Sequence, residues 1–188
     1  MLLTQPLSVK YSIKPRLAQP ALRPARRIRY NSPMIIRECL ASDAAAVDAL
    51  FQEFVAYLRS IGDESDYRFG AQQYLADGFG ADPAFRGFVA EDVSGLIGYV
   101  LYSRTYDGDY VRNFYIVDLY VQQASRGHGV GRMLMGAVEK RARAEGITRL
   151  TWAVHKNNTA ALRFYEGLGA QYSAHSYVMR LDLVERPR

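Results

Sequence analysis

Three segments with the composition of β-strands follow one another in the middle of this chain, and only short turns separate them. The strand-like segments are Phe85–Glu91, Leu96–Tyr106 and Arg112–Val121, with turn residues Asp92-Val93-Ser94-Gly95 and Asp107-Gly108-Asp109 between them. Strands joined by such short turns must run antiparallel, because a parallel connection needs a dozen or more residues. The sequence therefore predicts an antiparallel array at the centre of the fold.

Segments with helical periodicity lie on both sides of this array. Before it we expect a strand at Met34–Glu38, a first helix capped by Ser42 or Asp43, and a second helix near Gly70–Ala76. The apolar stripe of the first helix consists of Val47, Leu50, Phe51, Phe54 and Leu58. After it we expect a helix that ends at about Glu145 and buries Val130, Leu134, Ala137, Val138 and Ala142. A strand at Thr148–Val154, a helix at Asn158–Gly167 and a strand at Tyr177–Leu183 should follow. The order β-α-α-β-β-β-α-β-α-β predicts an α/β (α+β) domain with a mixed sheet.

The first 33 residues differ from the rest in composition. They contain seven basic residues, no acidic residue and five of the seven prolines, whereas residues 34–188 carry a net charge of −2. We expect residues 1–33 to be a disordered extension and residues 34–188 to be the domain. A transit peptide, a phosphate-seeking tail and a start codon chosen too far upstream are the alternatives, and the last is slightly preferred because Met34 opens the domain. The weakly acidic domain does not favour nucleic acid as a partner.

Cysteine, histidine and apolar content limit the other classes of protein. A single cysteine, Cys39, permits no intrachain disulfide and favours a reducing, cytoplasmic location. The three histidines are scattered without metal-ligand spacing, so no metal site is expected. No apolar stretch approaches the roughly 20 residues of a membrane span.

A glycine-rich loop, Ser125-Arg126-Gly127-His128-Gly129-Val130-Gly131-Arg132, joins the last strand of the array to the next helix. It lacks the Gly-Lys-Ser/Thr end of a Walker loop, and Arg132 occupies the position of the third Rossmann glycine. Glycines before a helix N-terminus direct backbone N–H groups at an anion, and Arg126 and Arg132 add positive charge. The loop therefore indicates an anion site, although a simple connection is equally consistent with this motif alone.

A second motif begins the following helix. Asn158 and Tyr165 are two helical turns apart and share one face, with the small Ala161 between them. An amide and a phenol on one face suit a ligand that contains amides. Taken singly, Asn158 is as well explained as an N-cap and Tyr165 as a core aromatic residue.

Together, the segments "RGHGVG" and "NNTAALRFYEGLGA" resemble two signatures of the GNAT superfamily of N-acetyltransferases. The resemblance covers roughly Ile35 to Leu183. The segments "DGFGADPAFRGFVAE" and "IVDLYV" are closer to the diamine and thialysine acetyltransferases. The resemblance implies the GNAT fold, a mixed, mostly antiparallel sheet of about six to seven strands flanked by about four helices, and a homodimer.

The resemblance also implies where acetyl-CoA binds, namely between the strand ending at Val121 and the strand Thr148–Val154. The residues that it assigns to cofactor binding are Leu119, Tyr120, Val121, Arg126, Gly127, His128, Gly129, Val130, Gly131, Arg132, Asn158 and Ala161. Tyr165 is placed beside the sulfur, where its phenol can protonate the departing thiolate as a general acid.

One position departs from the family pattern. The diamine acetyltransferases have a glutamate that helps to deprotonate the amine, and the aligned residue here is Val117. Asp118 matches the acidic residue that follows, so we expect it either to bind the amine or order a water, or else to pair with a core backbone group or arginine. Tyr102, Tyr106, Tyr115 and Tyr120 can form an aromatic wall for a cation, or serve simply as strand residues.

These features predict an N-acetyltransferase that acetylates a primary amine on a small polyamine-like or amino-acid-like molecule. A protein N-terminal or lysine acetyltransferase is one alternative. A CoA-binding module without catalysis, suggested by Val117, is the other. No membrane or nucleic-acid partner is expected.

Overall fold

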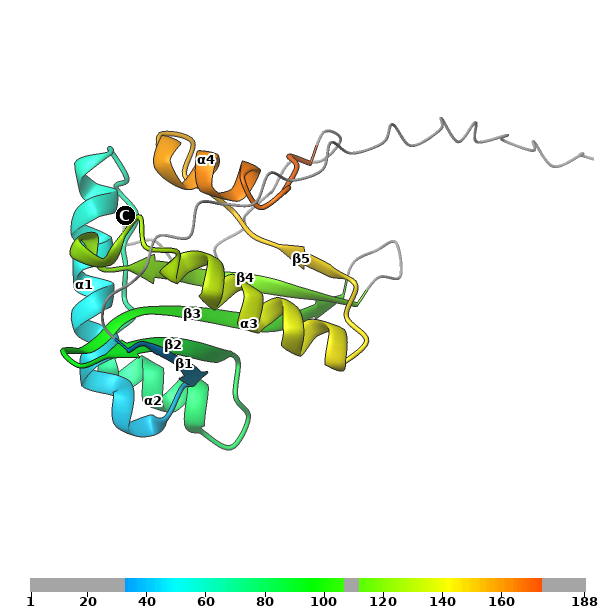
Figure 1. The fold of residues 1–188 in the computed structure, drawn as a ribbon. Helices are drawn as coiled ribbons and strands as arrows, with labels where there is room; N and C mark the ends of the chain where they lie inside the picture. The colour runs from blue at the N-terminus through cyan, green and yellow to red at the C-terminus, as the bar shows by residue number, and fades with distance from the viewer. Residues whose placement is uncertain (1–32, 107–111, 174–188) are drawn as a thin grey trace, which may run out of the picture.

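The computed structural model describes residues 33–106 and 112–173 of the 188-residue chain (Figure 1). Its strands and helices are β1 (Ile35–Glu38), α1 (Ala44–Ser60), α2 (Ala71–Phe79), β2 (Arg86–Asp92), β3 (Gly95–Tyr106), β4 (Arg112–Val121), α3 (Val130–Ala144), β5 (Arg149–Thr151) and α4 (Thr159–Glu166). Short 3-10 helices at Ala41–Asp43 and Gln123–Ser125 precede α1 and α3. The order predicted from the sequence is therefore confirmed as far as α4.

The strands form one mixed sheet in the order β1-β2-β3-β4-β5. The first four strands are antiparallel, as the short turns require, and β5 is parallel to β4. The described ranges contain five strands rather than the expected six to seven. The expected strand at Tyr177–Leu183, the turn at residues 107–109 and the extension over residues 1–32 lie outside the described residues.

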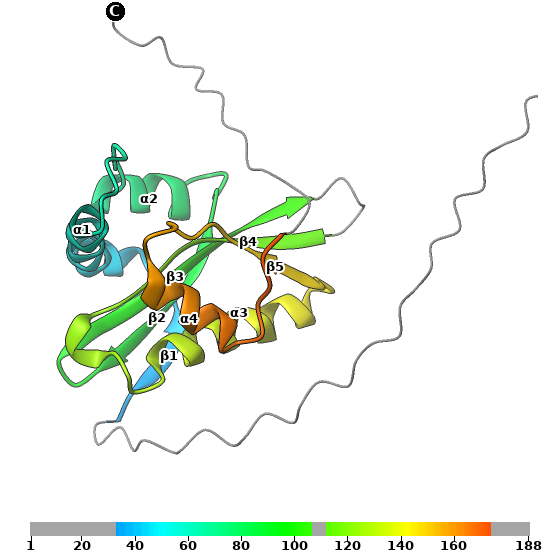
Figure 2. The same cartoon turned by 90° about the horizontal axis from the view of Figure 1, so that it is seen from above.

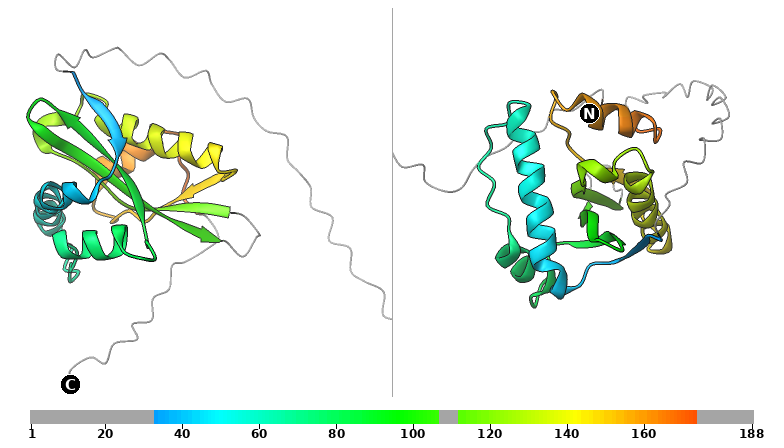
Figure 3. Two further views of the ribbon diagram at one scale, coloured as in Figure 1. Left: turned by 90° about the horizontal axis from the view of Figure 1, so that it is seen from below. Right: turned by 60° about the vertical axis from the view of Figure 1, so that its left-hand side comes forward.

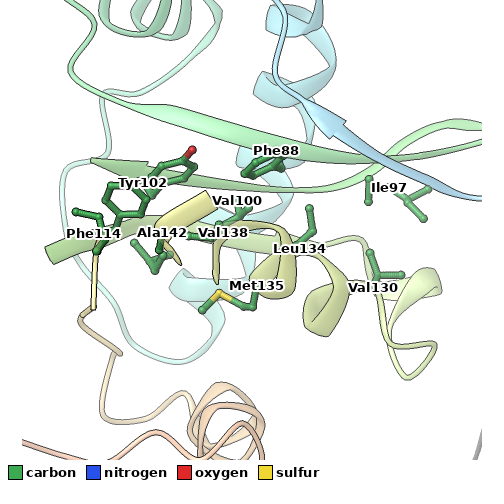
Figure 4. Close-up of a cluster of buried hydrophobic side chains, with 13 residues drawn as sticks. Phe88, Ile97, Val100, Tyr102, Phe114, Val130, Leu134, Met135, Val138 and Ala142 are labelled. Carbon is green, nitrogen blue, oxygen red and sulfur yellow. The ribbon is translucent and has the colours of Figure 1, made fainter. Parts of the chain in front are cut away.

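Helices cover both faces of the sheet. Figure 2 shows α1 and α2 on one side of the strands and α3 on the other, with α4 beside α3. On the α3 side, the expected apolar stripe of that helix packs against Phe88, Val100, Tyr102 and Phe114 (Figure 4). On the α1 side, the stripe of α1 packs with Tyr74, Tyr99, Leu101 and Tyr120 in a second cluster. The two faces of β3 therefore contribute tyrosines to different cores.

Two elements differ from the sequence-based bounds. β5 has three residues instead of the seven expected, because Trp152 leaves the sheet and packs on Tyr165 of α4, with ring centroids 4.7 Å apart. α2 continues to Phe79 although Gly78 interrupts its pattern. The ring of Phe85 approaches Gly78 so closely that a Cβ there would lie 2.7 Å from it. This glycine therefore permits close packing instead of ending the helix.

A β-bulge interrupts the pairing of β3 with β4 at Val117. Leu101 pairs with Asp118 and Tyr102 pairs with Ile116, so Val117 has no partner in the register. Val117 is 44% exposed, whereas Phe114 and Ile116 are buried on the α3 side. The extra residue shifts the alternation of side chains in the strand beyond it. Asp118 and Tyr120 therefore pair with Leu101 and Tyr99, which belong to the cluster on the α1 side.

Candidate active site

A cavity of about 420 Å³ lies beside the end of β4. β4 pairs with β5 only at Asn113–Tyr115, so its last residues have no strand neighbour on that side within the described ranges. The cavity is lined by Leu119, Tyr120, Val121, Arg126, Gly127, Gly129, Val130, Gly131, Arg132, Asn158, Ala161 and Tyr165, together with Phe54, Tyr57, Ser125, Ala160 and Phe164. It thus brings together every residue that the resemblance assigned to the cofactor, except His128.

The glycine-rich loop forms one end of this cavity. Gly127 and Gly129 have φ angles of +79° and +85°, a region that L-residues with side chains rarely adopt. Gly129 is the N-cap of α3 and has no side chain to bond the first N–H groups of the helix, and no acidic residue lies in its first turn. These N–H groups and the positive end of the helix dipole are therefore available to an anion.

The two arginines of the loop bond backbone carbonyls. The Arg126 Nε donates to the Val121 carbonyl at 2.9 Å, and its guanidinium lies over the rings of Tyr57 and Tyr120 at 5.2 and 5.3 Å. The Arg132 Nη2 donates to the Gly167 carbonyl at 3.0 Å and ties α3 to the end of α4. Arg126 therefore bonds the Val121 carbonyl, which an extended ligand added along the edge of β4 would otherwise use.

Asn158 joins α1 to the start of α4 at the cavity wall. Its Oδ1 accepts hydrogen bonds from the Ala161 N–H at 3.1 Å and from the Tyr57 hydroxyl of α1 at 2.8 Å. The N-cap interpretation of Asn158 is therefore correct, and its side-chain oxygen is fully used within the protein. Asn158 is only 8% exposed, yet it lines the cavity. The right-hand view of Figure 3 shows α4, in orange, near the upper end of α1, in cyan.

Tyr165 lines the cavity away from the loop, and Asp118 lies close enough to it to interact electrostatically. Burial, and secondarily the Asp118 charge, raise the pKa of the Tyr165 phenol well above its ordinary value. Burial raises the pKa of Asp118 to about 7. Asp118 forms no ion pair with an arginine or lysine of the described residues. Its carboxylate is therefore a desolvated group that titrates near neutral pH.

The segment after α1 supplies further polar groups near Asp118. Burial raises the pKa of Tyr67 to about 12, with contributions from Asp63 and Asp118. The Tyr67 hydroxyl donates to Asp63 Oδ2 at 2.7 Å. Hydrogen bonds, chiefly from Ser65, lower the pKa of Asp63 to about 2. Asp63 is thus ionised and bonded, in contrast to Asp118.

The four tyrosines do not form an aromatic wall, which favours the alternative that most of them serve as strand residues. Tyr120 lines the cavity, but Tyr102 belongs to the core on the α3 side and Tyr106 is 64% exposed. The alternation of side chains along β3 is the physical reason: Tyr99 and Leu101 face the α1 side together with Tyr120, so Tyr102 faces the α3 side.

Comparison with known proteins agrees with this geometry. Residues 47–170 match the model of the acetyltransferase (GNAT) family. The thialysine N-epsilon-acetyltransferase of Bos taurus is 32% identical over 146 residues, covering 73% of this chain and 84% of that protein. The L-methionine sulfoximine/L-methionine sulfone acetyltransferase of Pseudomonas paraeruginosa is 28% identical over 141 residues, covering 73% and 80%. An aminoglycoside N-acetyltransferase in complex with CoA superposes with a TM-score of 0.64 at 18% identity, covering 82% of this chain and 98% of that one.

The chain therefore belongs to the GNAT family, and it is an N-acetyltransferase. The family uses acetyl-CoA. Within the described residues, no helix is long and apolar enough to cross a membrane. No group of three or more His, Cys, Asp or Glu side chains there is arranged to hold a metal ion.

Sequence reasoning missed the contribution of α1 to the cavity. Phe54 was expected only as a core residue, and Tyr57 was not assigned a role. The Tyr57–Asn158 bond spans 101 positions, and neither motif contains a signal for it. Phe164, whose ring would lie 3.2 Å from a Cβ at Gly131, was read only as part of the second motif.

Proposed function

We propose that this protein transfers an acetyl group from acetyl-CoA to the primary amine of a small amino-acid-like or polyamine-like molecule. The observation that carries the proposal is the single cavity that joins the free edge of β4, the glycine-rich loop, Asn158 and Tyr165. Amino-acid derivatives are named as substrates of the relatives from Bos taurus and Pseudomonas paraeruginosa, which supports an acceptor of this class.

The residues around the cavity fit acetyl-CoA. The N-terminus of α3 and its two left-handed glycines suit the diphosphate, and Arg126 can exchange its bond to Val121 for a phosphate contact. The backbone edge at Leu119–Val121 suits the amides of the pantetheine arm, because it offers the groups of an unpaired strand. Bound acetyl-CoA supplies a thioester that an unprotonated amine can attack.

The chain's own residues then move two protons. An alkylammonium has a pKa of about 10.4, so the amine must lose a proton before it attacks. Asp118 is assigned this role, since a carboxylate whose pKa is near 7 matches the working pH of a general base. Tyr165 is assigned the second proton: its O–H proton goes to the departing sulfur, and the phenolate regains a proton from the N–H bond that breaks as the attacking nitrogen becomes an amide. The raised pKa of Tyr165 keeps the phenol protonated throughout the pH range in which Asp118 is ionised.

An amine panel tests the proposal. The full chain is incubated with acetyl-CoA and spermidine, thialysine, lysine or short peptides, and free thiol is measured. We expect thiol release with small amines that carry an amino-acid-like group. Release with peptides only would instead assign a protein acceptor, and release with none of a broad panel would overturn the proposed transfer.

We also propose a homodimer and a cytoplasmic location. The resemblance supports the dimer, and the single cysteine supports a reducing compartment. Light scattering of the purified chain tests the first, and fractionation of the source cells tests the second.

A further inference from the structure

Tyr99 of β3 is a buried tyrosine whose hydroxyl the proposed mechanism does not use. The residue is 0% exposed, and its Oη has no hydrogen-bond partner among the residues that the structure describes. A buried hydroxyl without a partner is unfavourable, because it has lost water and gained nothing in exchange. A phenylalanine would fill the same space without this cost, so the hydroxyl itself requires an explanation.

The strand register places Tyr99 diagonally across from Asp118. Tyr99 pairs with Tyr120, and Leu101 pairs with Asp118, so Tyr99 and Asp118 are offset by two positions on neighbouring antiparallel strands. Diagonal neighbours of this kind are within reach of an aromatic side chain. The Asp118 charge also acts directly on the Tyr99 phenol, whose pKa is raised by burial first and then by Asp118 and Tyr120.

The other groups that face this position already have partners. Tyr67, from the segment after α1, donates to Asp63, and the Tyr120 hydroxyl donates to Glu53 Oε2 at 3.1 Å. Tyr165 faces Asp118 from α4 and lines the cavity. No cation of the described residues pairs with Asp118. A carboxylate accepts a stronger hydrogen bond than a neutral phenol does, so Asp118 is the favoured acceptor for the Tyr99 hydroxyl.

The two side chains are not hydrogen-bonded in the structure. We propose that Tyr99 is a positioning residue for Asp118: once the carboxylate is ionised, the Tyr99 hydroxyl turns to donate a hydrogen bond that holds it in the orientation needed to accept a proton from the substrate amine. The inference rests on the role assigned to Asp118 above. In the step itself, an N–H bond of the ammonium breaks and an O–H bond forms on the Asp118 oxygen that Tyr99 does not contact. Tyr99 keeps its own proton throughout.

The hydrogen bond has a measurable electrostatic consequence. It favours the charged form of Asp118 and so opposes the effect of burial, which favours the protonated form. Removing the hydroxyl should therefore raise the pKa of Asp118, by about one unit for a hydrogen bond to a charged group. A role in packing alone would leave this pKa unchanged.

The test compares Tyr99→Phe with Tyr102→Phe. Tyr102 is a matched control, because it is buried on the same strand but packs on the opposite face, against Phe88 and Phe114 (Figure 4). We expect Tyr99→Phe to shift the acid limb of kcat/KM for the amine upward by about one pH unit, an approximately tenfold loss on that limb. Activity should return at alkaline pH and KM for acetyl-CoA should not change. Tyr102→Phe should leave the profile in place.

A measurement without turnover separates this inference from the proposed function. Carbon-13 NMR of the aspartate carboxyls, with Asp118→Asn to assign the signal, gives the pKa of Asp118 in each variant. An upward shift in Tyr99→Phe supports the contact even if no amine is acetylated, in which case only the proposed function fails. An active protein whose Asp118 pKa is the same in both forms would overturn the role of Tyr99.

A further observation on the wild-type chain covers the case in which Tyr99→Phe does not fold. A tyrosine hydroxyl proton bonded to a carboxylate exchanges slowly and resonates downfield, and Asp118→Asn should remove that resonance. Its absence from the wild-type spectrum at pH 8 would also overturn the inference.

Discussion

The two ends of the cavity are built from different chemical groups. At the end formed by Gly127, Gly129 and the start of α3, the main chain provides the N–H groups and no side chain caps the helix. At the end formed by Tyr165, side chains provide the chemistry, and Asp118 acts electrostatically on the phenols of Tyr165 and Tyr99. The first end should therefore set the affinity for acetyl-CoA, and the second should set the rate of transfer and its dependence on pH.

The largest expected effect follows from Asp118→Asn at the side-chain end. Loss of a general base should lower kcat/KM for the amine by about 10³-fold and remove the acid limb near pH 7, with KM for acetyl-CoA unchanged. Steady-state kinetics from pH 6 to pH 9 measure this. A variant with wild-type turnover would remove Asp118 from the mechanism.

The same substitution should stabilise the fold at alkaline pH, which separates lost catalysis from lost structure. The folded pKa of Asp118, about 7, lies above its unfolded value, so the folded state holds this proton more tightly. Its contribution to stability is therefore greatest in acid and declines as pH rises through the folded pKa. Asp118→Asn should raise the free energy of unfolding at pH 8 by about 2–4 kcal/mol and change it little at pH 4, as measured by urea denaturation.

Tyr165→Phe tests the second side chain of that end. We expect kcat to fall by about 10²-fold, because the departing sulfur loses its proton donor while the aromatic ring keeps its packing on Trp152. Tyr172→Phe is the control, since Tyr172 is 68% exposed and its hydroxyl donates to Glu166 at the surface. Equal turnover in the two variants would exclude Tyr165 as the acid.

The contrast between the ends also explains which parts of the site the sequence could predict. The glycine-rich loop depends on local backbone conformation. A run such as Gly127-His128-Gly129 before an apolar helical pattern indicates residues with positive φ at the start of a helix. The antiparallel strands were likewise fixed by short turns. Local rules therefore located the main-chain end of the cavity from the sequence.

The side-chain end depends on contacts between distant segments. Nothing local to Val117 predicts the bulge that leaves it 44% exposed, because the bulge is a property of pairing with β3. The contact between Tyr57 and Asn158 depends on how α1 packs across the sheet. β5 ends at Thr151 because Trp152 packs on α4, a tertiary effect that strand propensity could not indicate.

Gly129→Ala tests the main-chain end. Alanine at a φ of +85° is strained, although its Cβ would meet no atom within 4 Å, so the change acts on the backbone alone. We expect KM for acetyl-CoA to rise about tenfold, with kcat nearly unchanged, because the N–H groups at the start of α3 are displaced. Gly146→Ala is the control, since Gly146 has a φ of +69° and an equally open surrounding at the opposite end of α3. A similar KM in both variants would argue against an anion site at the loop.

Tyr57→Phe should have the smallest effect, and it shows how far the main-chain end extends. The substitution removes one of the two hydrogen bonds to Asn158 Oδ1 but keeps the ring under Arg126 and the bond from the Ala161 N–H. One such bond contributes about 1 kcal/mol, so KM for acetyl-CoA should rise about threefold to fivefold while kcat is retained. Ser60→Ala is the control, because it removes an exposed hydrogen bond to the Tyr57 carbonyl from the same helix without touching the cavity. A fall in kcat at constant KM would instead place Tyr57 with the side chains that transfer protons, and α1 would then contribute to the chemistry rather than to cofactor binding.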